Sequence, residues 1–317
     1  MTNFSRAQTI FSLAALAAGA IPVTARAQSA APIRVGMIPI DVAAQAFYAK
    51  DEGFFKSRGL DVDLQVASSG GAIYPAIVSS SLDIGAGNFV AIAQAHLRGI
   101  PFVLIAPAGS YSARTPSAAI LVAKSSPFRS AKDLGGKTIA VDSLKNLAYI
   151  AVASWAEKNG LDISTVHVTE IPMSAMGAAL SAGRIDAASI LEPALSHAVS
   201  DNDARILARH FDAISPEFLE GAWFCTADYA KAHPDVIRKF ADAMTDASRW
   251  ANRNPAAAGT VLQTYSKSPP TPVQYRTFFP ERLKAAEVQL LVDAAAKYGV
   301  IDRSFPASEM IAPGFGS

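Results

Sequence analysis

The side chains best suited to binding chemistry lie where an apolar strand gives way to a helix. The stretch "AVDSLKNLAYIAVASWAEKNG", residues 140–160, passes from an apolar run through Asp142 into a helical pattern. Ser143 is a good helix cap there, and Asn146 follows in the first turn. Because the N–H groups of an open helix N-terminus favour negative charge, this spacing predicts an anion-binding position around Ser143 and Asn146.

Glu192 offers a different chemistry at the end of another apolar run, beside Pro193. Its carboxylate could accept hydrogen bonds from an amine or an aminopyrimidine of a bound molecule. It could equally cap the helix that begins at Pro193. The sequence leaves both roles open.

The residue types needed for metal binding or nucleophilic catalysis do not occur at useful spacings. The stretch "GGKT" at 135–138 lacks the first glycine of a phosphate-binding loop, because Ala131 stands in its place. No G-x-S-x-G or S-x-x-K sequence is present, the histidines form no metal-ligand pair, and Cys225 is the one cysteine. We therefore predict no catalytic residue, no metal site and no cofactor, and a protein that is not an enzyme.

Two copies of one strand–helix unit position the candidate residues. Apolar strands alternate with helical patterns over residues 33–86 and again over 138–190, which is typical of a parallel α/β sheet. "RGLDV" at 58–62 matches "NGLDI" at 159–163, and "AIVSSSLDIGA" at 76–86 matches "ALSAGRIDAAS" at 179–189. We predict two lobes with the same plan, joined by two crossovers, and a helical C-terminal segment. Lobe 1 comprises residues 33–113 and 218–317, and lobe 2 comprises residues 114–217.

In open α/β sheets, ligands bind beyond the carboxyl ends of the strands. Tyr111 and Trp223 lie near the two crossovers, where aromatic side chains could wall a cleft, and Lys145 and Arg114 could balance an anion. The strand-end rule gives the remaining candidates, which are Ile40, Asp41, Ser69, Gly70 and Asn88 in lobe 1 and Ser143, Asn146, Met173, Ser174 and Glu192 in lobe 2.

The N-terminus and the composition indicate an exported protein. An apolar stretch after Arg6 and the sequence Ala25-Arg26-Ala27 fit a cleavable signal peptide over residues 1–27. Cys225 lies far from that site, which argues against a lipoprotein, and no later segment is long enough to span a membrane. The 28 basic and 27 acidic residues give a net charge of +1, without the basic patch of a nucleic-acid-binding protein. We expect a periplasmic location in a Gram-negative bacterium.

Several stretches together resemble the solute-binding proteins of ABC importers for sulfonates, taurine and nitrate. The superfamily also includes binders and synthases of the thiamine pyrimidine, although the cysteine-rich iron-binding signature of the synthases is absent here. The stretches are "QAFYAKDEGFFKSRGLDVDLQVASSG", "SLDIGAGNFVAIAQAHLRGIPFVLIA", "DLGGKTIAVDS" and "SAGRIDAASILEP".

The resemblance implies a two-lobed, type II-like periplasmic-binding fold that closes on a small solute and delivers it to a membrane permease. It adds Gln45 to the candidate contacts. The predicted function is capture of a small organic anion, sulfonate-like or carboxylate-like, by hinge closure of a monomer. The alternatives are a binder of a thiamine-precursor pyrimidine or other nitrogen heterocycle, and a periplasmic enzyme or sensor on the same fold.

Overall fold

The first of two five-stranded sheets gathers strands from both ends of the chain. A computed structural model describes residues 31–67, 69–267 and 276–316, and the predicted signal peptide lies outside them. The strand order is β2-β1-β3-β12-β4, with β1, β2 and β3 parallel and β12 antiparallel to both of its neighbours. The strands are β1 (Ile33–Met37), β2 (Val62–Val66), β3 (Ile84–Asn88), β4 (Phe102–Pro107) and β12 (Gly221–Thr226).

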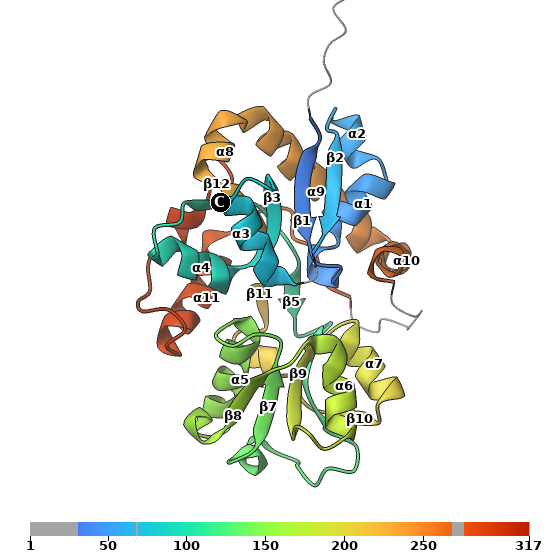
Figure 1. Cartoon of the computed structure of the whole chain (residues 1–317), viewed down its shortest axis with the longest axis vertical. Helices are drawn as coiled ribbons and strands as arrows, with labels where there is room; N and C mark the ends of the chain where they lie inside the picture. The colour runs from blue at the N-terminus through green and yellow to red at the C-terminus, as the bar shows by residue number, and fades with distance from the viewer. Residues whose placement is uncertain (1–30, 68, 268–275, 317) are drawn as a thin grey trace, which may run out of the picture. The chain divides into compact units, whose positions relative to one another are not determined.

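The second sheet repeats this plan with a continuous stretch of chain (Figure 1). Its order is β8-β7-β9-β6-β10, with β7, β8 and β9 parallel and β6 antiparallel to both neighbours. Each sheet thus has three parallel strands with the first in the middle, then an antiparallel strand, then an edge strand. The strands are β6 (Ala118–Ala123), β7 (Thr138–Val141), β8 (His167–Glu170), β9 (Ala187–Leu191) and β10 (Ala204–Ala208).

Two short antiparallel strands accompany the chain between the sheets. They are β5 (Ser110–Ser112) and β11 (Glu217–Leu219), which pair through Phe218 opposite Tyr111. Tyr111 is buried among Phe211 and Phe218, and its hydroxyl donates a hydrogen bond to Asp212 Oδ1 over 2.6 Å. Its environment is a packed aromatic cluster.

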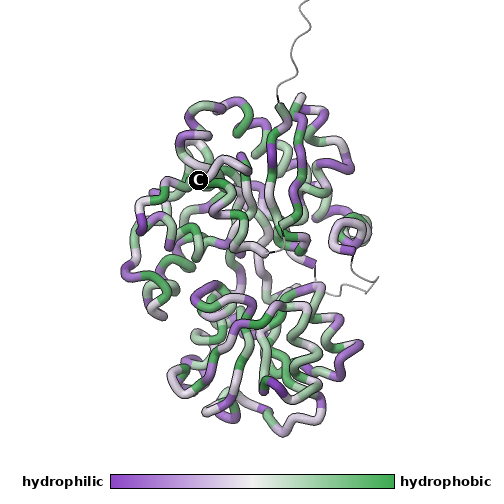
Figure 2. Tube along the Cα trace, in the orientation of Figure 1, coloured by the Kyte–Doolittle hydropathy of each residue, from purple (hydrophilic) through white to green (hydrophobic). Residues whose placement is uncertain are grey.

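The helices cover the sheets because their apolar faces match the apolar strand faces. In Figure 2 hydrophobic colour follows the strands, and hydrophilic colour marks outer helix faces and loops. α9 packs against α1 and β4, and α11 packs against α4 and α5. The helices are α1 (Gln45–Asp51), α2 (Phe54–Ser57), α3 (Ile73–Val78), α4 (Phe89–Leu97), α5 (Leu147–Lys158), α6 (Met173–Ser181), α7 (Ala194–Asp201), α8 (Ala227–Ala232), α9 (Pro234–Arg253), α10 (Pro255–Ser266) and α11 (Ala285–Lys297).

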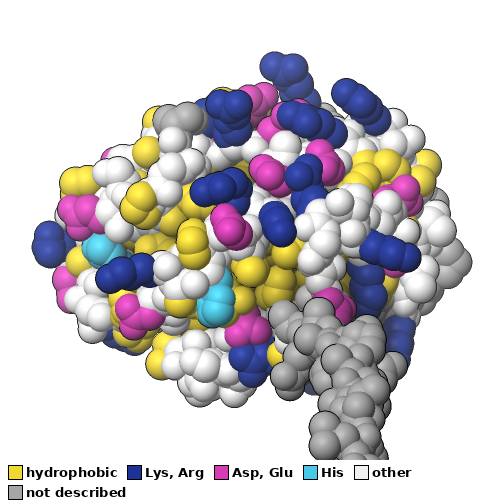
Figure 3. Space-filling model, turned by 90° about the horizontal axis from the view of Figure 1, so that it is seen from above, with side chains coloured by type: hydrophobic (Ala, Val, Ile, Leu, Met, Phe, Trp, Pro, Cys, Tyr) yellow, Lys and Arg dark blue, Asp and Glu magenta, His cyan; other side chains and the backbone are white. Residues whose placement is uncertain are grey.

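The surface of the described residues shows mixed charge. On the face drawn in Figure 3, lysines and arginines are interspersed with acidic side chains. Among the described residues, the helices are all too short or too polar to cross a membrane.

Candidate functional site

Backbone hydrogen bonds join the loop at the carboxyl end of β1 to the segments that connect the two sheets. The residues after β1 form a short 3-10 helix, Asp41–Ala43, and Val42 O accepts a hydrogen bond from Gly109 N. Gly109 O in turn accepts one from Glu220 N, at the start of β12. Residues from three distant parts of the sequence therefore meet at one place, which we call the junction.

Asp41 is the buried acid of the first sheet at the junction. Its Oδ2 accepts a hydrogen bond from Thr277 N over 3.0 Å, and its Oδ1 lies 2.7 Å from Arg276 Nη2 in an ion pair. Arg276 Nη2 also donates to Tyr48 Oη over 2.7 Å. Burial raises the pKa of Asp41, and the nearby Arg276 opposes that rise. Sequence analysis missed Arg276, because no motif links it to a segment more than 200 residues earlier.

Glu220 is a second buried acid at the junction, and it too was missed from the sequence. Its Oε1 accepts a hydrogen bond from Ser117 Oγ over 3.4 Å, whereas its Oε2 has no hydrogen-bond partner. Burial raises the pKa of Glu220 to about 8, and the charge of Asp41 adds to the rise. A carboxyl group with this pKa is largely protonated at neutral pH, and can then donate a hydrogen bond as well as accept one.

Glu192 joins the junction from the second sheet, directly after β9. Its backbone N–H donates to Ser117 O, next to the Ser117 hydroxyl that faces Glu220. Its two carboxyl oxygens accept hydrogen bonds from Ser196 N (3.2 Å) and Ser196 Oγ (2.8 Å). Pro193 is the N-cap residue of α7, and Glu192, one residue earlier, binds the first turn of that helix through Ser196. Burial raises the pKa of Glu192, and the charge of Asp41 contributes to the rise.

Buried polar atoms without hydrogen-bond partners concentrate at the junction. Among the described residues six such side-chain atoms occur, and four belong to Asp41, Glu220, Arg276 and Thr277. Of these four, Asp41 Oδ1 retains its ion pair with Arg276, and the Thr277 hydroxyl hydrogen-bonds the Asp41 carboxylate. Glu220 Oε2 and Arg276 Nη1 are thus the two junction atoms left without a partner, which is unusual because folded chains satisfy nearly all buried polar groups.

Asn146, and not Ser143, caps the helix that follows β7. Asn146 Oδ1 accepts a hydrogen bond from Tyr149 N over 3.2 Å, and its Nδ2 donates to Asp142 Oδ1. Ser143 lies in the preceding loop, where its hydroxyl reaches only Leu144 O at 3.5 Å. The predicted cap is therefore wrong, because three more loop residues separate the strand from the helix.

Gln45 and Trp223 are buried inside the first sheet's core. Trp223 Nε1 donates to Gln45 Oε1 over 2.8 Å, and Gln45 Nε2 donates to Ser248 Oγ and Pro107 O. Both residues are 0% exposed. Because all their polar atoms are paired inside the core, we remove these two from the set of direct ligand contacts. Tyr111 is removed for the same reason.

The other predicted residues lie at the carboxyl ends of parallel strands, as the strand-end rule places them. Asn88 ends β3 and caps α4 by accepting from Ala91 N. Ser69 and Ser174 are exposed, whereas Ile40, Gly70 and Met173 are half-buried. Ser69 and Gly70 follow β2, and Met173 and Ser174 open α6 after β8.

The two basic residues considered from the sequence do not supply charge to the junction. Arg114 is highly exposed and lies 3.7 Å from Glu217, and Lys145 is exposed in the loop before α5. The guanidinium groups that influence the junction acids are those of Arg276 and Arg209. Within the described ranges, no group of three or more His, Cys, Asp or Glu is arranged to hold a metal ion.

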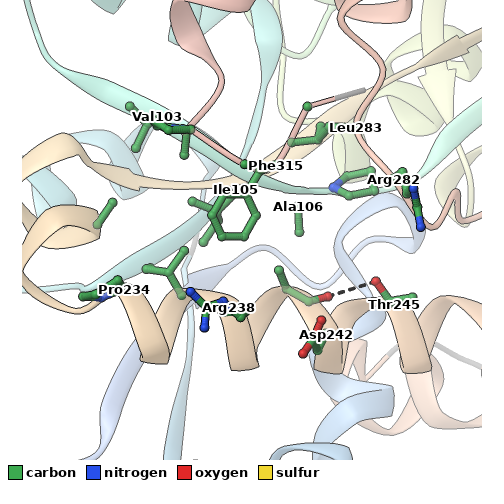
Figure 4. Close-up of a pocket in the computed structure, with 18 of the residues that line it drawn as sticks. Val103, Ile105, Ala106, Pro234, Arg238, Asp242, Thr245, Arg282, Leu283 and Phe315 are labelled. Carbon is green, nitrogen blue, oxygen red and sulfur yellow. Dashed lines mark hydrogen bonds between the residues drawn. The ribbon is translucent and has the colours of Figure 1, made fainter.

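Two cavities in the described part of the chain differ in how they relate to the junction. The larger, about 970 Å³, lies between β4 and α9, with Ile105, Ala106 and Phe315 at its centre (Figure 4). None of the predicted contact residues lines it. The smaller, about 690 Å³, is lined by Thr115, Arg276 and Thr277 together with residues of α9 and α10, and therefore borders the junction.

Comparison with known proteins gives a consistent result for the fold. The NMT1/THI5-like family model matches residues 42–258. The alkanesulfonate-binding protein SsuA from Xanthomonas axonopodis pv. citri, bound to MOPS, superposes with a TM-score of 0.74 at 20% identity, covering 90% of this chain and 99% of that one. The ligand-binding component of an ABC-type import system from Staphylococcus aureus gives 0.78 at 14% identity, over 89% and 97% of the two chains. These likenesses show the periplasmic-binding fold.

A curated relative is similar in sequence as well. The taurine-binding periplasmic protein of Escherichia coli strain K12 is 29% identical over 211 residues, which amount to 65% of this chain. The match spans 62% of the relative, less than two thirds of its length.

Proposed function

The chain belongs to the NMT1/THI5-like family, and we propose that it is the solute-binding component of an ABC importer, which captures a small organic sulfonate or carboxylate. Its partners would be that solute and a permease at the inner membrane. The periplasm is the location that its predicted signal peptide and its taurine-binding periplasmic relative support. We propose that it acts as a monomer and without catalysis.

The proposed mechanism is closure of two lobes around the solute. We propose lobe boundaries at 33–113 with 218–317 and at 114–217, so that each lobe holds one sheet. A solute that contacts both lobes only when they are closed shifts the population toward the closed state. The chain passes between the lobes at 109–117 and 209–221, and these segments contain residues of the junction. Closure of the lobes would therefore move the residues that form the hydrogen bonds of the junction.

The observation that carries this proposal is the concentration of unpartnered buried polar atoms at the junction. Glu220 Oε2 and Arg276 Nη1 each lack a hydrogen-bond partner. A solute bound here gains from both, because an unmade buried hydrogen bond is costly to the free protein. The Arg276 atom carries protons at any pH, which favours a solute rich in acceptors, such as a sulfonate or carboxylate.

The relatives support the anion over the heterocycle. The names of the similar proteins refer to taurine and alkanesulfonates, and the Glu192 carboxylate, on which the pyrimidine alternative rested, is already paired with Ser196. A protonated amine beside the sulfonate, as in taurine, would find the acids of the junction nearby.

A thermal-shift screen of the chain from Gln28 onward, refolded to remove bound solute, tests the proposal. The panel contains taurine, short alkanesulfonates, nitrate, small carboxylates and pyrimidines. A solute at about 100 times its Kd adds about 2.7 kcal/mol to the free energy of unfolding, which raises the melting temperature. A folded protein that responds to pyrimidines alone, or to nothing in the panel, contradicts the proposed solute class.

Gly70→Trp tests whether the solute lies at the strand ends. A Cβ at Gly70 would approach only Ile38 Cδ1, at 3.9 Å, so the added side chain meets no close contact at its base, beyond the carboxyl end of β2. We expect Gly70→Trp to remove the shift. The matched control is Ser81→Trp, at an exposed position before β3, at the opposite end of the strand, and it should retain the shift.

A further inference from the structure

The 690 Å³ cavity beside the junction has the composition of an acid-binding subsite. Its walls come from the end of α9, from α10 and from residues 276–279, with Thr115 at one side. Ala256, Ala258 and Phe279 supply apolar surface, and Arg276 is the basic residue among those that line it. A cavity with apolar walls and one guanidinium suits a small molecule with one acid group and a short apolar body.

Arg276 is held in this wall with part of its bonding capacity unused. Its Nη2 serves Asp41 and Tyr48, whereas Nη1 is buried and has no partner. Nη1 lies 3.6 Å from the position that a Cβ on Gly259 would occupy, and Gly259 lines the cavity. Since a guanidinium presents five N–H donors, its binding of Asp41 leaves donors for a second anion.

Thr277, the next residue, is bound to Asp41 as well. Its backbone N–H donates to Asp41 Oδ2 over 3.0 Å, and its buried hydroxyl hydrogen-bonds the same carboxylate, which lowers the pKa of Asp41. Arg276 Nη1 is therefore a buried donor of this wall that lacks an acceptor, which is unusual in a folded chain. An acceptor oxygen supplied by a bound molecule would satisfy it.

Other polar side chains of the cavity are already paired within the chain. Asn252 exchanges hydrogen bonds with the backbone of Phe279, and Thr260 Oγ1 donates to Ala256 O. The larger cavity differs in its charges, because Arg58 and Arg249 on its rim are paired with Asp242, Asp246 and Glu281.

We propose that the 690 Å³ cavity binds the sulfonate or carboxylate group of the solute, with Arg276 Nη1 as its hydrogen-bond donor. The inference rests on the proposed function and specifies which end of the solute binds on the first-sheet side. Arg276 lies beyond residues 42–258, the part that the family model matches. Asp41 binds the other terminal nitrogen, Nη2, of the same guanidinium, so its negative charge lies near the bound acid group.

Isothermal titration with ethanesulfonate and propionate tests the subsite, with 1-propanol as the neutral control. The variants are Asp41→Asn, Arg276→Lys and the double variant Asp41→Asn/Arg276→Gln, which removes both charges together and so avoids a buried unpaired carboxylate. Arg282→Gln, a basic residue of the other cavity, is the matched control. Circular dichroism and a melting curve establish that each variant is folded.

We expect the wild type and Arg282→Gln to bind both anions and not the alcohol. Asp41→Asn should bind equally well or more tightly, because Arg276 is then released from its ion pair. The double variant should bind at least tenfold more weakly, with Arg276→Lys in between.

Two failures of this experiment are distinguishable. If the wild type binds the anions and the double variant binds them within twofold, the solute's acid group lies elsewhere and the proposed function stands. If the wild type binds neither anion, both the subsite and the proposed solute class are overturned. A loss of binding in Asp41→Asn alone contradicts the subsite, because it would mean that Asp41 itself contacts the solute.

Discussion

The two sheets each place a buried carboxylate after a parallel strand, but they satisfy it in different ways. In the second sheet, Glu192 is bonded by the hydroxyl and backbone N–H of Ser196, four residues later in the first turn of α7. In the first sheet, Asp41 is bonded by Arg276 and Thr277. Thr277 lies 236 residues after Asp41 in the sequence. One carboxylate is satisfied by its own helix, and the other by tertiary structure.

This difference predicts unequal consequences when a partner is removed. The Ser196 hydroxyl can be lost while Glu192 keeps the backbone N–H, which every residue at position 196 except proline supplies. The Arg276 charge cannot be replaced by the backbone, so its loss leaves Asp41 buried and uncompensated. An ion pair between distant segments, such as Asp41 with Arg276, can change when a ligand binds without unfolding a helix.

The largest effect is expected for Arg276→Met. Removal of one partner from a buried ion pair costs about 3–5 kcal/mol, because the remaining charge stays in a medium of low polarity. Urea unfolding of the wild type and the variant at pH 7 measures this change in the free energy of unfolding.

The matched variant in the second sheet is Ser196→Ala, which should cost only about 1 kcal/mol. The double variant Asp41→Asn/Arg276→Met should regain much of the loss caused by Arg276→Met. Equal costs for Arg276→Met and Ser196→Ala would remove the distinction between the two sheets.

The second prediction concerns Glu220 and pH. Its folded pKa, about 8, is above the ordinary value of 4.5, so the folded state holds a proton that the unfolded state loses between these two pH values. The free energy of unfolding therefore falls as pH rises from about 4.5 to about 8, by at most about 1.4 kcal/mol per pH unit, and this contribution is constant above that range.

Glu220→Gln removes this titration. Relative to the wild type, the variant should become more stable as pH rises from 5 to 8, and the difference should level off near pH 9. Urea unfolding of both proteins at each pH measures it. A difference that is independent of pH would contradict the assignment of the titration to Glu220.

The smallest changes in the free energy of unfolding are expected for the two candidate capping residues of α5. Asn146→Ala removes the acceptor for Tyr149 N and should cost about 1 kcal/mol. Ser143→Ala removes no hydrogen bond shorter than 3.5 Å and should change the free energy of unfolding by less than about 0.5 kcal/mol. Melting curves of the two variants, measured in parallel, decide between Asn146 and Ser143.

Local patterns located most of the helices and strands. The apolar patterns predict strands at 62–66 and 138–141 and a helix at 147–158, and the structure has β2, β7 and α5 at these bounds, because strong turn and cap signals flank the runs. The pattern also predicts one helix over 43–58, which the structure divides, because Gly53 adopts a left-handed conformation with φ of 74°. A strand predicted at 82–86 lies instead at Ile84–Asn88.

The fourth and fifth strands of each sheet were harder to assign from the pattern. β12 follows the whole second sheet in the sequence, yet it lies between β3 and β4 of the first sheet. A short, mostly apolar run is compatible with a strand in either sheet, so its neighbours depend on contacts between segments far apart in the sequence.

The sequence by itself determined the α/β class, the repeated unit and the loops at the strand ends, because these follow from hydrophobic period, turn residues and spacing within about 30 residues. Only the tertiary structure decided which polar groups meet. Gln45 and Trp223 are joined in the core, whereas Asp41, Glu220 and Arg276 are joined at the junction. The physical reason is that the pairing of buried polar groups depends on distances and desolvation in the folded chain, and neither can be read from the sequence.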